Sequence, residues 1–457
     1  MRDPGGHIVF GSDFVTRHLN APACPNHFLH SNLAARWVER GDLIGYEWVD
    51  SSTLRSPRLP FVSYPSEWTA YQMFLAAKLT LRMHVEAVAE GWDLKDASAW
   101  NVVFDGLRPV FVDLLSFEHL RERVWRASGQ YARHFLLPLF LEKKQKLKAH
   151  QCFQLWRDGA PPEQAAAILG PFRFLTRYWP LTTRGKDLAA PVSCNSKDSE
   201  LSSLPIAALQ RYRQNLNTGL DWMLNGLNPD CWSNRSSVWG QYEHERKHYE
   251  TEALDNKRRA IRKWLNQIQP MWTLDIGCNS GEFSAMGAEV GARVICLDGD
   301  SLALNNLCQR HAKSPYSRHL YPVLGQIDDA YGGRGWLGAE FSSLTSRLEK
   351  RVDVVMLLAV AHHLAIAGSI SLRDVFGMVR AYSKCWAIVE LLSELDPRVV
   401  QLCQHFGRTP KEFSLDQQFD ALRSAGFDVV EVASDSSNTR PLVLLKINQV
   451  QEVAPSN

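Results

Sequence analysis

The chain has 457 residues, too many for one ordinary domain, so two domains joined by a connecting segment are expected. Its composition, 45% hydrophobic and 22% charged, is typical of a globular protein that buries sizeable cores. A net charge of +2 gives no support to a broad nucleic-acid-binding surface, although a local basic patch stays open. The nine cysteines are scattered singly, without a C-x-x-C pair or histidines at ligand spacing, so no metal site is expected.

Neither a secretory signal nor a membrane span is expected. The N-terminus has no basic segment followed by an apolar core. The longest apolar stretch, residues 352–361, is too short to cross a bilayer. We therefore predict a cytoplasmic protein that does not engage a membrane, and the sequence does not determine its oligomeric state.

Changes in composition divide the chain into four parts. Residues 1–185 form an N-terminal α+β domain rich in aromatic residues. Residues 186–206 are polar and rich in serine, as linkers often are. Residues 207–450 form the second domain, which begins with a helical extension, and residues 451–457 are expected to be a disordered tail.

The N-terminal domain carries one constellation of interest. After a helix predicted at 68–89, Asp96 is followed by Asn101, by a strand–turn–strand at 102–112 and by Asp113. Kinases and small-molecule phosphotransferases use Asp, Asn and a hairpin-borne Asp at similar spacing, as catalytic base and magnesium ligands. However, no glycine-rich loop and no Val-Ala-Ile-Lys-like strand precedes them. An active phosphotransferase site, a degenerate kinase-like scaffold and an unrelated fold with an Asp-Gly hairpin all stay open.

The second domain contains a βαβ pattern at residues 273–300. A strand ends at residue 276, a glycine-bearing turn follows, then a helix at 282–289 and a strand at 294–297 that ends at Asp298. Such a unit binds a nucleotide-like ligand, and the acid after its second strand takes the ribose hydroxyls. The spacing is D-x-G-x-x-x-G, not the dinucleotide pattern, so no pyrophosphate needs to be cradled. S-adenosylmethionine therefore fits better than NAD.

The α/β alternation continues to the end of the domain. Strands are predicted at 321–325, 352–360 and 385–391, and helices at 372–383 and 415–425. Two extended runs at 428–433 and 440–447 are expected to form an antiparallel pair. The predicted class is α/β, with a Rossmann-like, mostly parallel sheet that ends in a hairpin and resembles the class I methyltransferase fold.

Several positions are candidates for binding the cofactor. Gly277 and Gly281, with Cys278 and Asn279 between them, let the backbone approach the methionine part. The predicted polar contacts are Asp275 with the amino group, Asp298 with the ribose hydroxyls (Asp300 if the strand ends later) and Asp328 with the adenine amine. The alternatives are a tight turn without ligand, a helix N-cap at Asp298 and a solvated loop acid at Asp328.

The catalytic candidates follow the fourth and fifth strands. His362 or His363 could act as a general base, or could only orient the substrate or pack the loop. Glu390 ends the fifth strand, and its alternative role is a salt bridge with Arg398 or Lys384. Methyl transfer from a sulfonium relies mostly on alignment, so the lack of an obvious nucleophile is no objection.

Five segments carry a family resemblance: LDIGCNSGEFS (274–284), LLAVAHHLAI (357–366), WAIVELLSELDP (386–397), PFVSYPSEWTAYQ (60–72) and residues 94–118. Together they resemble a bacterial family of two-part class I methyltransferases that includes nodulation-associated members. Two mild departures are Ser280, where related chains have Thr, and Leu-Leu-Ser at 391–393 in place of a Phe-Val-Pro-like stretch. The resemblance implies dependence on S-adenosylmethionine and does not settle the acceptor.

The sequence thus predicts an S-adenosylmethionine-dependent methyltransferase acting on a small molecule or glycan-like compound. Two alternatives are a scaffold that holds the cofactor without turnover and an ATP-dependent phosphotransferase in the N-terminal domain.

Overall fold

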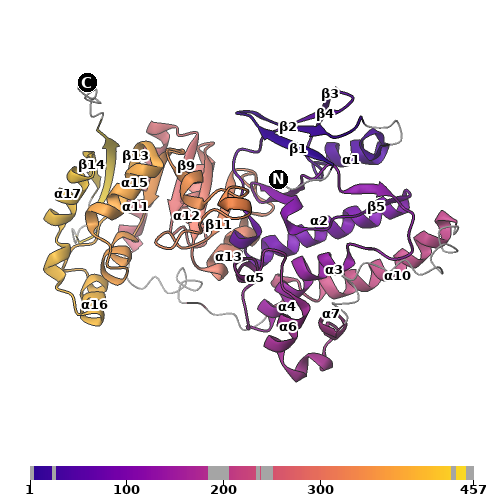
Figure 1. Ribbon diagram of the computed structural model, residues 1–457. Helices are drawn as coiled ribbons and strands as arrows, with labels where there is room; N and C mark the ends of the chain where they lie inside the picture. Colours follow the sequence, from indigo (N-terminus) through magenta and orange to yellow (C-terminus); the bar gives the residue numbers. More distant parts are fainter. Residues whose placement is uncertain are drawn as a thin grey trace. The chain divides into compact units, whose positions relative to one another are not determined.

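The computed structural model describes residues 5–22, 27–183, 205–232, 237, 251–433 and 439–448. The chain forms two compact units, Met1–Arg235 and Ser236–Asn457, each with its own sheets and helices (Figure 1). Most of the predicted linker and the whole predicted tail lie outside the described residues.

Helix α10 (Ile206–Asn225) belongs to the first unit, whereas the sequence predicts it as the helical extension of the second domain. It packs along α2 (Ala70–Ala89). Arg213 of α10 is fully buried and forms an ion pair with Asp93 at 2.5 Å. Contacts with residues distant in sequence, such as Asp93, therefore place this helix in the first unit.

The described strands of the second unit form one seven-stranded sheet in the order β11-β10-β9-β12-β13-β15-β14. All neighbours are parallel except β15, which runs antiparallel to both β13 and β14. The mostly parallel sheet with a terminal antiparallel pair is thus confirmed. The strands are β9 (Trp272–Ile276), β10 (Arg293–Asp298), β11 (Leu320–Leu324), β12 (Val352–Leu357), β13 (Ser383–Glu390), β14 (Phe427–Ala433) and β15 (Leu442–Ile447).

Helices connect these strands and flank the sheet in Figure 1. The central strand β9 is buried at every position, as a strand covered on both faces requires. Ile261, Trp264 and Leu265 of α11 join one core with Met286 of α12 and Met356 of β12. The helices are α11 (Thr251–Ile268), α12 (Glu282–Glu289), α13 (Ser301–His311), α14 (Leu344–Leu348), α15 (Leu372–Tyr382), α16 (Pro397–Phe406) and α17 (Leu415–Ser424), of which α13, α14 and α16 were not predicted.

The first unit combines small antiparallel sheets with a helical core. In the described residues, four strands pair in the order β1 (Gly6–Phe10), β2 (Phe14–Leu19), β4 (Thr53–Pro57), β3 (Glu47–Asp50), and α1 (Asn32–Arg40) lies between β2 and β3 in sequence. Two further pairs are β5 (Trp92–Leu94) with β8 (Phe117–His119), and the predicted hairpin of β6 (Val102–Asp105) with β7 (Arg108–Phe111). The remaining helices are α3 (Ser128–Tyr131), α4 (Leu137–Lys143), α5 (Ala149–Leu155), α6 (Pro162–Leu169) and α7 (Trp179–Thr183).

Helix α2 forms the centre of this unit and confirms the helix predicted at 68–89. It begins at Ala70 because Thr69 is its N-cap: the Thr69 hydroxyl accepts from the N–H of Gln72, and the Gln72 side chain accepts from the N–H of Thr69. Across the described parts of both units, no helix has the length and apolar character needed to cross a membrane.

Candidate functional site

The turn after β9 has the backbone geometry that its glycines suggested. Gly277 and Gly281 have φ angles of +73° and +85°, and Asn279 also lies in the left-handed region at +51°. A Cβ at Gly277 would come within 2.5 Å of Val360 Cγ2, and one at Gly281 within 2.6 Å of Leu307 Cδ1. A side chain at either position would therefore be strained by the backbone conformation and would have to displace a neighbouring side chain.

Asp298 ties this turn to the end of β10. Its Oδ2 accepts from the N–H of Asn279 at 2.8 Å, and its Oδ1 accepts from the N–H of Asp300 at 2.7 Å. Burial raises the pKa of Asp298 to about 6, although these backbone hydrogen bonds oppose the shift. The carboxylate is thus held by N–H groups of the main chain.

Asp300 has the N-cap role that the sequence leaves open as the alternative for Asp298. It is the N-cap of α13, and its Oδ1 accepts from the N–H groups of Leu302 and Ala303. The third predicted contact, Asp328, is exposed in the loop after β11. The three acids thus differ in environment: Asp298 is hydrogen-bonded to the main chain, Asp300 caps a helix and Asp328 is exposed in a loop.

Asp275 lies inside the sheet, only 2% exposed. Burial raises its pKa to about 6; the Ser284 hydroxyl, which donates at 2.6 Å, lowers it, and the negative charge of Asp298 raises it further. Burial also raises the pKa of Cys278 well above that of a free thiol. Cys278 is therefore a neutral part of the turn, while Asp275 and Asp298 are two acids close enough to influence each other.

The two histidines follow β12 beside the glycine turn. The N–H of His363 donates to the carbonyl of Val360, the residue whose side chain adjoins Gly277. His362 is 7% exposed, and its Nδ1 has no hydrogen-bond partner among the described residues. Burial lowers the pKa of both imidazoles, and the Arg398 charge lowers both further, so both rings are neutral near pH 7.

Glu390 forms an ion pair whose partner the sequence did not reveal. Its Oε2 lies 2.5 Å from Nζ of Lys257 on α11, and the two side chains are 2% and 10% exposed. The alternative partners considered from the sequence have contacts elsewhere: Lys384 lies near Asp353, and the Arg398 guanidinium donates to Gln401. Lys257 is the site residue that sequence reasoning missed, because nothing local marks a helical lysine as the partner of a strand end.

Within the described residues, no group of three or more His, Cys, Asp or Glu side chains could hold a metal ion. The carboxyl edge of the sheet offers acids, amide N–H groups and neutral imidazoles. These groups can bind an uncharged or cationic ligand and accept a proton.

The structure also brings together the three polar residues singled out in the first unit. Asn101 Nδ2 donates to the carbonyl of Asp96 and to the Ser116 hydroxyl, both at 3.3 Å, and that hydroxyl donates to Asp113 Oδ2 at 2.6 Å. Asp113 also pairs with Arg17 of β2. This cation had not been identified, because Arg17 lies far from the hairpin in sequence.

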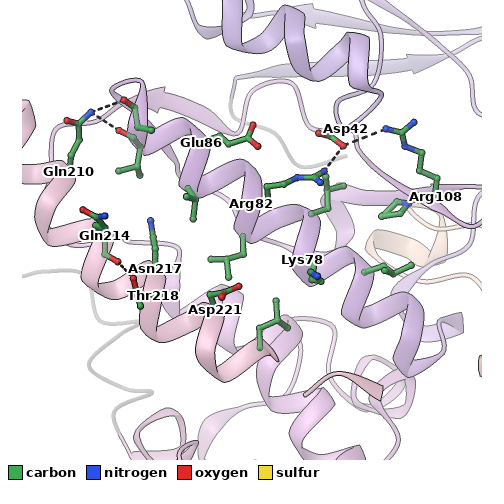
Figure 2. Close-up of a pocket in the computed structure, with 18 residues that line it drawn as sticks. Asp42, Lys78, Arg82, Glu86, Arg108, Gln210, Gln214, Asn217, Thr218 and Asp221 are labelled. Carbon is green, nitrogen blue, oxygen red and sulfur yellow. Dashed lines mark hydrogen bonds and ion pairs between the residues drawn. The ribbon is translucent and has the colours of Figure 1, made fainter. Parts of the chain in front are cut away.

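A cavity of about 1200 Å³, not predicted from the sequence, lies in the first unit between α2 and α10. Figure 2 shows Lys78 and Arg82 of α2 on one side and Gln214 and Asp221 of α10 on the other. Arg82 forms an ion pair with Asp42 at 2.6 Å. The residues that line the cavity do not include Asp96, Asn101 or Asp113. The cavity is therefore a separate feature from the hydrogen-bonded group that these three residues form.

Several solved structures that the chain resembles are methyltransferases. The magnesium protoporphyrin IX methyltransferase ChlM of Synechocystis PCC 6803, with bound S-adenosylmethionine, matches 48% of this chain and 88% of its own at 13% identity and a TM-score of 0.30. WbdD, a bifunctional kinase-methyltransferase, matches 46% of this chain and 43% of its own at 17% identity and a TM-score of 0.33. Both scores lie below 0.5.

Among characterised sequences, the chain is similar to the nodulation protein NoeA of Rhizobium meliloti (strain 1021). The two are 27% identical over 402 residues, which cover 83% of this chain and 81% of NoeA. No protein-family model matches the chain. A kinase-like fold for the first unit is not confirmed by these matches and stays a prediction.

Proposed function

We propose that the second unit is a class I S-adenosylmethionine-dependent methyltransferase. The observation that carries the proposal is Asp298, an acid at the end of the second strand of a βαβ unit, held by the N–H of Asn279 in the glycine turn. An acid at this place takes the ribose hydroxyls of a nucleoside ligand. The observed order of the seven-stranded sheet, with its single antiparallel insertion, also resembles the class I methyltransferase fold.

The remaining cofactor contacts follow from the same edge of the sheet. The left-handed turn from Gly277 to Gly281 lets the main chain approach the methionine part of the cofactor. Asp275, buried below that turn, would balance the charge of the amino group. Bound S-adenosylmethionine would supply an electrophilic methyl group; this chain's residues would orient it and exclude water.

The acceptor would enter beside the histidine turn. His363 is less buried than His362, and burial lowers the pKa of both, so a neutral His363 could accept the proton that an attacking hydroxyl or amine loses. In this proposal the Lys257–Glu390 ion pair holds the end of β13 in position beside the acceptor. A small molecule or glycan-like compound stays the proposed acceptor.

Calorimetry with S-adenosylhomocysteine tests the cofactor site. The full chain should bind one equivalent, and Asp298→Ala should weaken binding about 10- to 100-fold, since hydrogen bonds to a charged group contribute about 1.5–3 kcal/mol. Absence of binding by the wild-type chain would overturn the proposal.

Incubation with cell extract and methyl-labelled cofactor separates an enzyme from a scaffold. Label should pass to an acceptor with the wild-type chain and fall at least about 100-fold with His363→Ala, the usual contribution of a general base. Cofactor binding without label transfer would favour the scaffold alternative.

A further inference from the structure

In the first unit, Arg17 of β2 and Asp113 form an ion pair. Arg17 Nη2 lies 3.1 Å from Asp113 Oδ1, and the side chains are 9% and 22% exposed. Arg17 lies on β2 and Asp113 follows β7, so α1 and α2 separate the two residues in sequence. A largely buried ion pair needs good geometry and further hydrogen bonds to offset the loss of hydration.

Asp113 has those further hydrogen bonds. Its Oδ2 accepts from the Ser116 hydroxyl at 2.6 Å, and its Oδ1 also accepts from the N–H of Leu115 at 3.3 Å. Both carboxylate oxygens are therefore engaged by groups of the protein. The Ser116 hydroxyl also accepts from Asn101 Nδ2, so it lies between Asn101 and Asp113.

In kinases with a similar Asp, Asn and Asp spacing, the Asn and the second Asp hold the magnesium ions. Magnesium requires oxygen ligands in near-ideal octahedral geometry. Here a hydroxyl bridges the two residues, and a guanidinium already neutralises the carboxylate. A divalent cation at Asp113 would displace the Ser116 and Arg17 contacts and would meet a second positive charge.

We propose that Arg17 takes the place of the metal ion beside Asp113, so that this site binds no metal and does not transfer phosphate through magnesium. The residues present do not fit the metal. The inference concerns the first unit alone and does not depend on methyl transfer in the second.

The competing interpretation is that Arg17 binds a nucleotide phosphate and pairs with Asp113 only while the ligand is absent. The two interpretations predict opposite effects of removing Arg17. If Arg17 replaces the metal, Arg17→Ala leaves Asp113 unpaired and creates affinity for a divalent cation. If Arg17 binds phosphate, the same change weakens metal–nucleotide binding.

The experiment is a titration of the full chain with Mn²⁺, with and without ATP, followed by the electron paramagnetic resonance signal of free Mn²⁺. We expect the wild type and Asp113→Asn to give the same titration. Arg17→Ala should bind one Mn²⁺ per chain at least tenfold more tightly than the wild type, and Arg17→Ala/Asp113→Asn should lose that gain. Wild-type binding of Mn²⁺ or Mn²⁺–ATP that Asp113→Asn abolishes would overturn the proposal.

Two further variants control for charge and folding. Arg55→Ala removes a partly exposed arginine of the neighbouring strand β4 that pairs with Glu47, and it should leave Mn²⁺ binding unchanged. Arg17→Lys keeps a cation beside Asp113 and should therefore bind Mn²⁺ no more tightly than the wild type. If Arg17→Ala does not fold, the comparison of the wild type with Asp113→Asn still shows whether Asp113 binds Mn²⁺ in the native chain.

Discussion

Lys257 and Glu390 join the helix that precedes the sheet to the end of its fifth strand, through a buried ion pair of 2.5 Å. Lys257 Nζ also lies 4.8 Å from the centre of the Phe283 ring, and its charge lowers the pKa of Asp275. One side chain of α11 thus acts on residues of α12, β9 and β13.

Removing one partner of this pair should be costly. Lys257→Met leaves the Glu390 carboxylate buried without its cation, so the free energy of unfolding should fall by about 3 kcal/mol or more. Urea unfolding followed by tryptophan fluorescence measures the change. Lys263→Met on the same helix is the matched control: its pair with Glu431 is exposed, so the loss should stay below about 1 kcal/mol. Equal losses in the two variants would contradict the prediction.

The Gly277 position should tolerate no side chain. Gly277→Ala adds a collision with Val360 to the cost of a left-handed backbone, and it should destabilise the chain more than Gly291→Ala. Gly291 has a similar φ of +88° but open space around it, so its replacement should cost only about 1–2 kcal/mol. Thermal unfolding compares the two. Val360→Ala should restore part of the stability of Gly277→Ala, and no restoration would mean that the collision is not the cause.

Substitutions of Asp298 and Asp300 should affect different properties, the first ligand affinity and the second stability. Asp300→Ala removes the N-cap of α13 and should lower the free energy of unfolding by about 1 kcal/mol, while affinity for S-adenosylhomocysteine changes little. Asp298→Ala should lose affinity, as described above. Calorimetry and urea unfolding on both variants check this, and a large loss of affinity in Asp300→Ala would reverse the two roles.

Binding of S-adenosylhomocysteine should depend on pH through the acids whose pKa burial raises to about 6. In the proposed site the ionised carboxylates would accept hydrogen bonds from ribose and pair with the ammonium group, so the ligand would favour the deprotonated forms. Affinity should therefore fall as the pH drops from 7.5 to 5, and binding at pH 6 should release protons. Calorimetry at pH 6 in two buffers with different ionisation enthalpies measures that release. In Asp298→Asn the release should shrink; an unchanged value would exclude Asp298 as its source.

Local sequence patterns were enough to predict the strands and the glycine turn at the carboxyl edge of the second unit's sheet. The period of the apolar runs predicted β9, β10 and β12, and the spacing of Gly277 and Gly281 predicted a left-handed turn, because each depends on a few consecutive residues. The antiparallel pair at the C-terminus followed from two extended runs around a polar turn.

Contacts between distant segments were decided only by the tertiary structure. Lys257 with Glu390, Arg17 with Asp113, and α10 with the first unit are all such contacts. The carboxylates at positions 298 and 300 are chemically the same in the sequence. Only the direction of the chain leaving β10 makes Asp300 the helix cap and places Asp298 against the glycine turn. A sequence pattern reports the local backbone, whereas burial and charge pairing depend on what the rest of the fold places nearby.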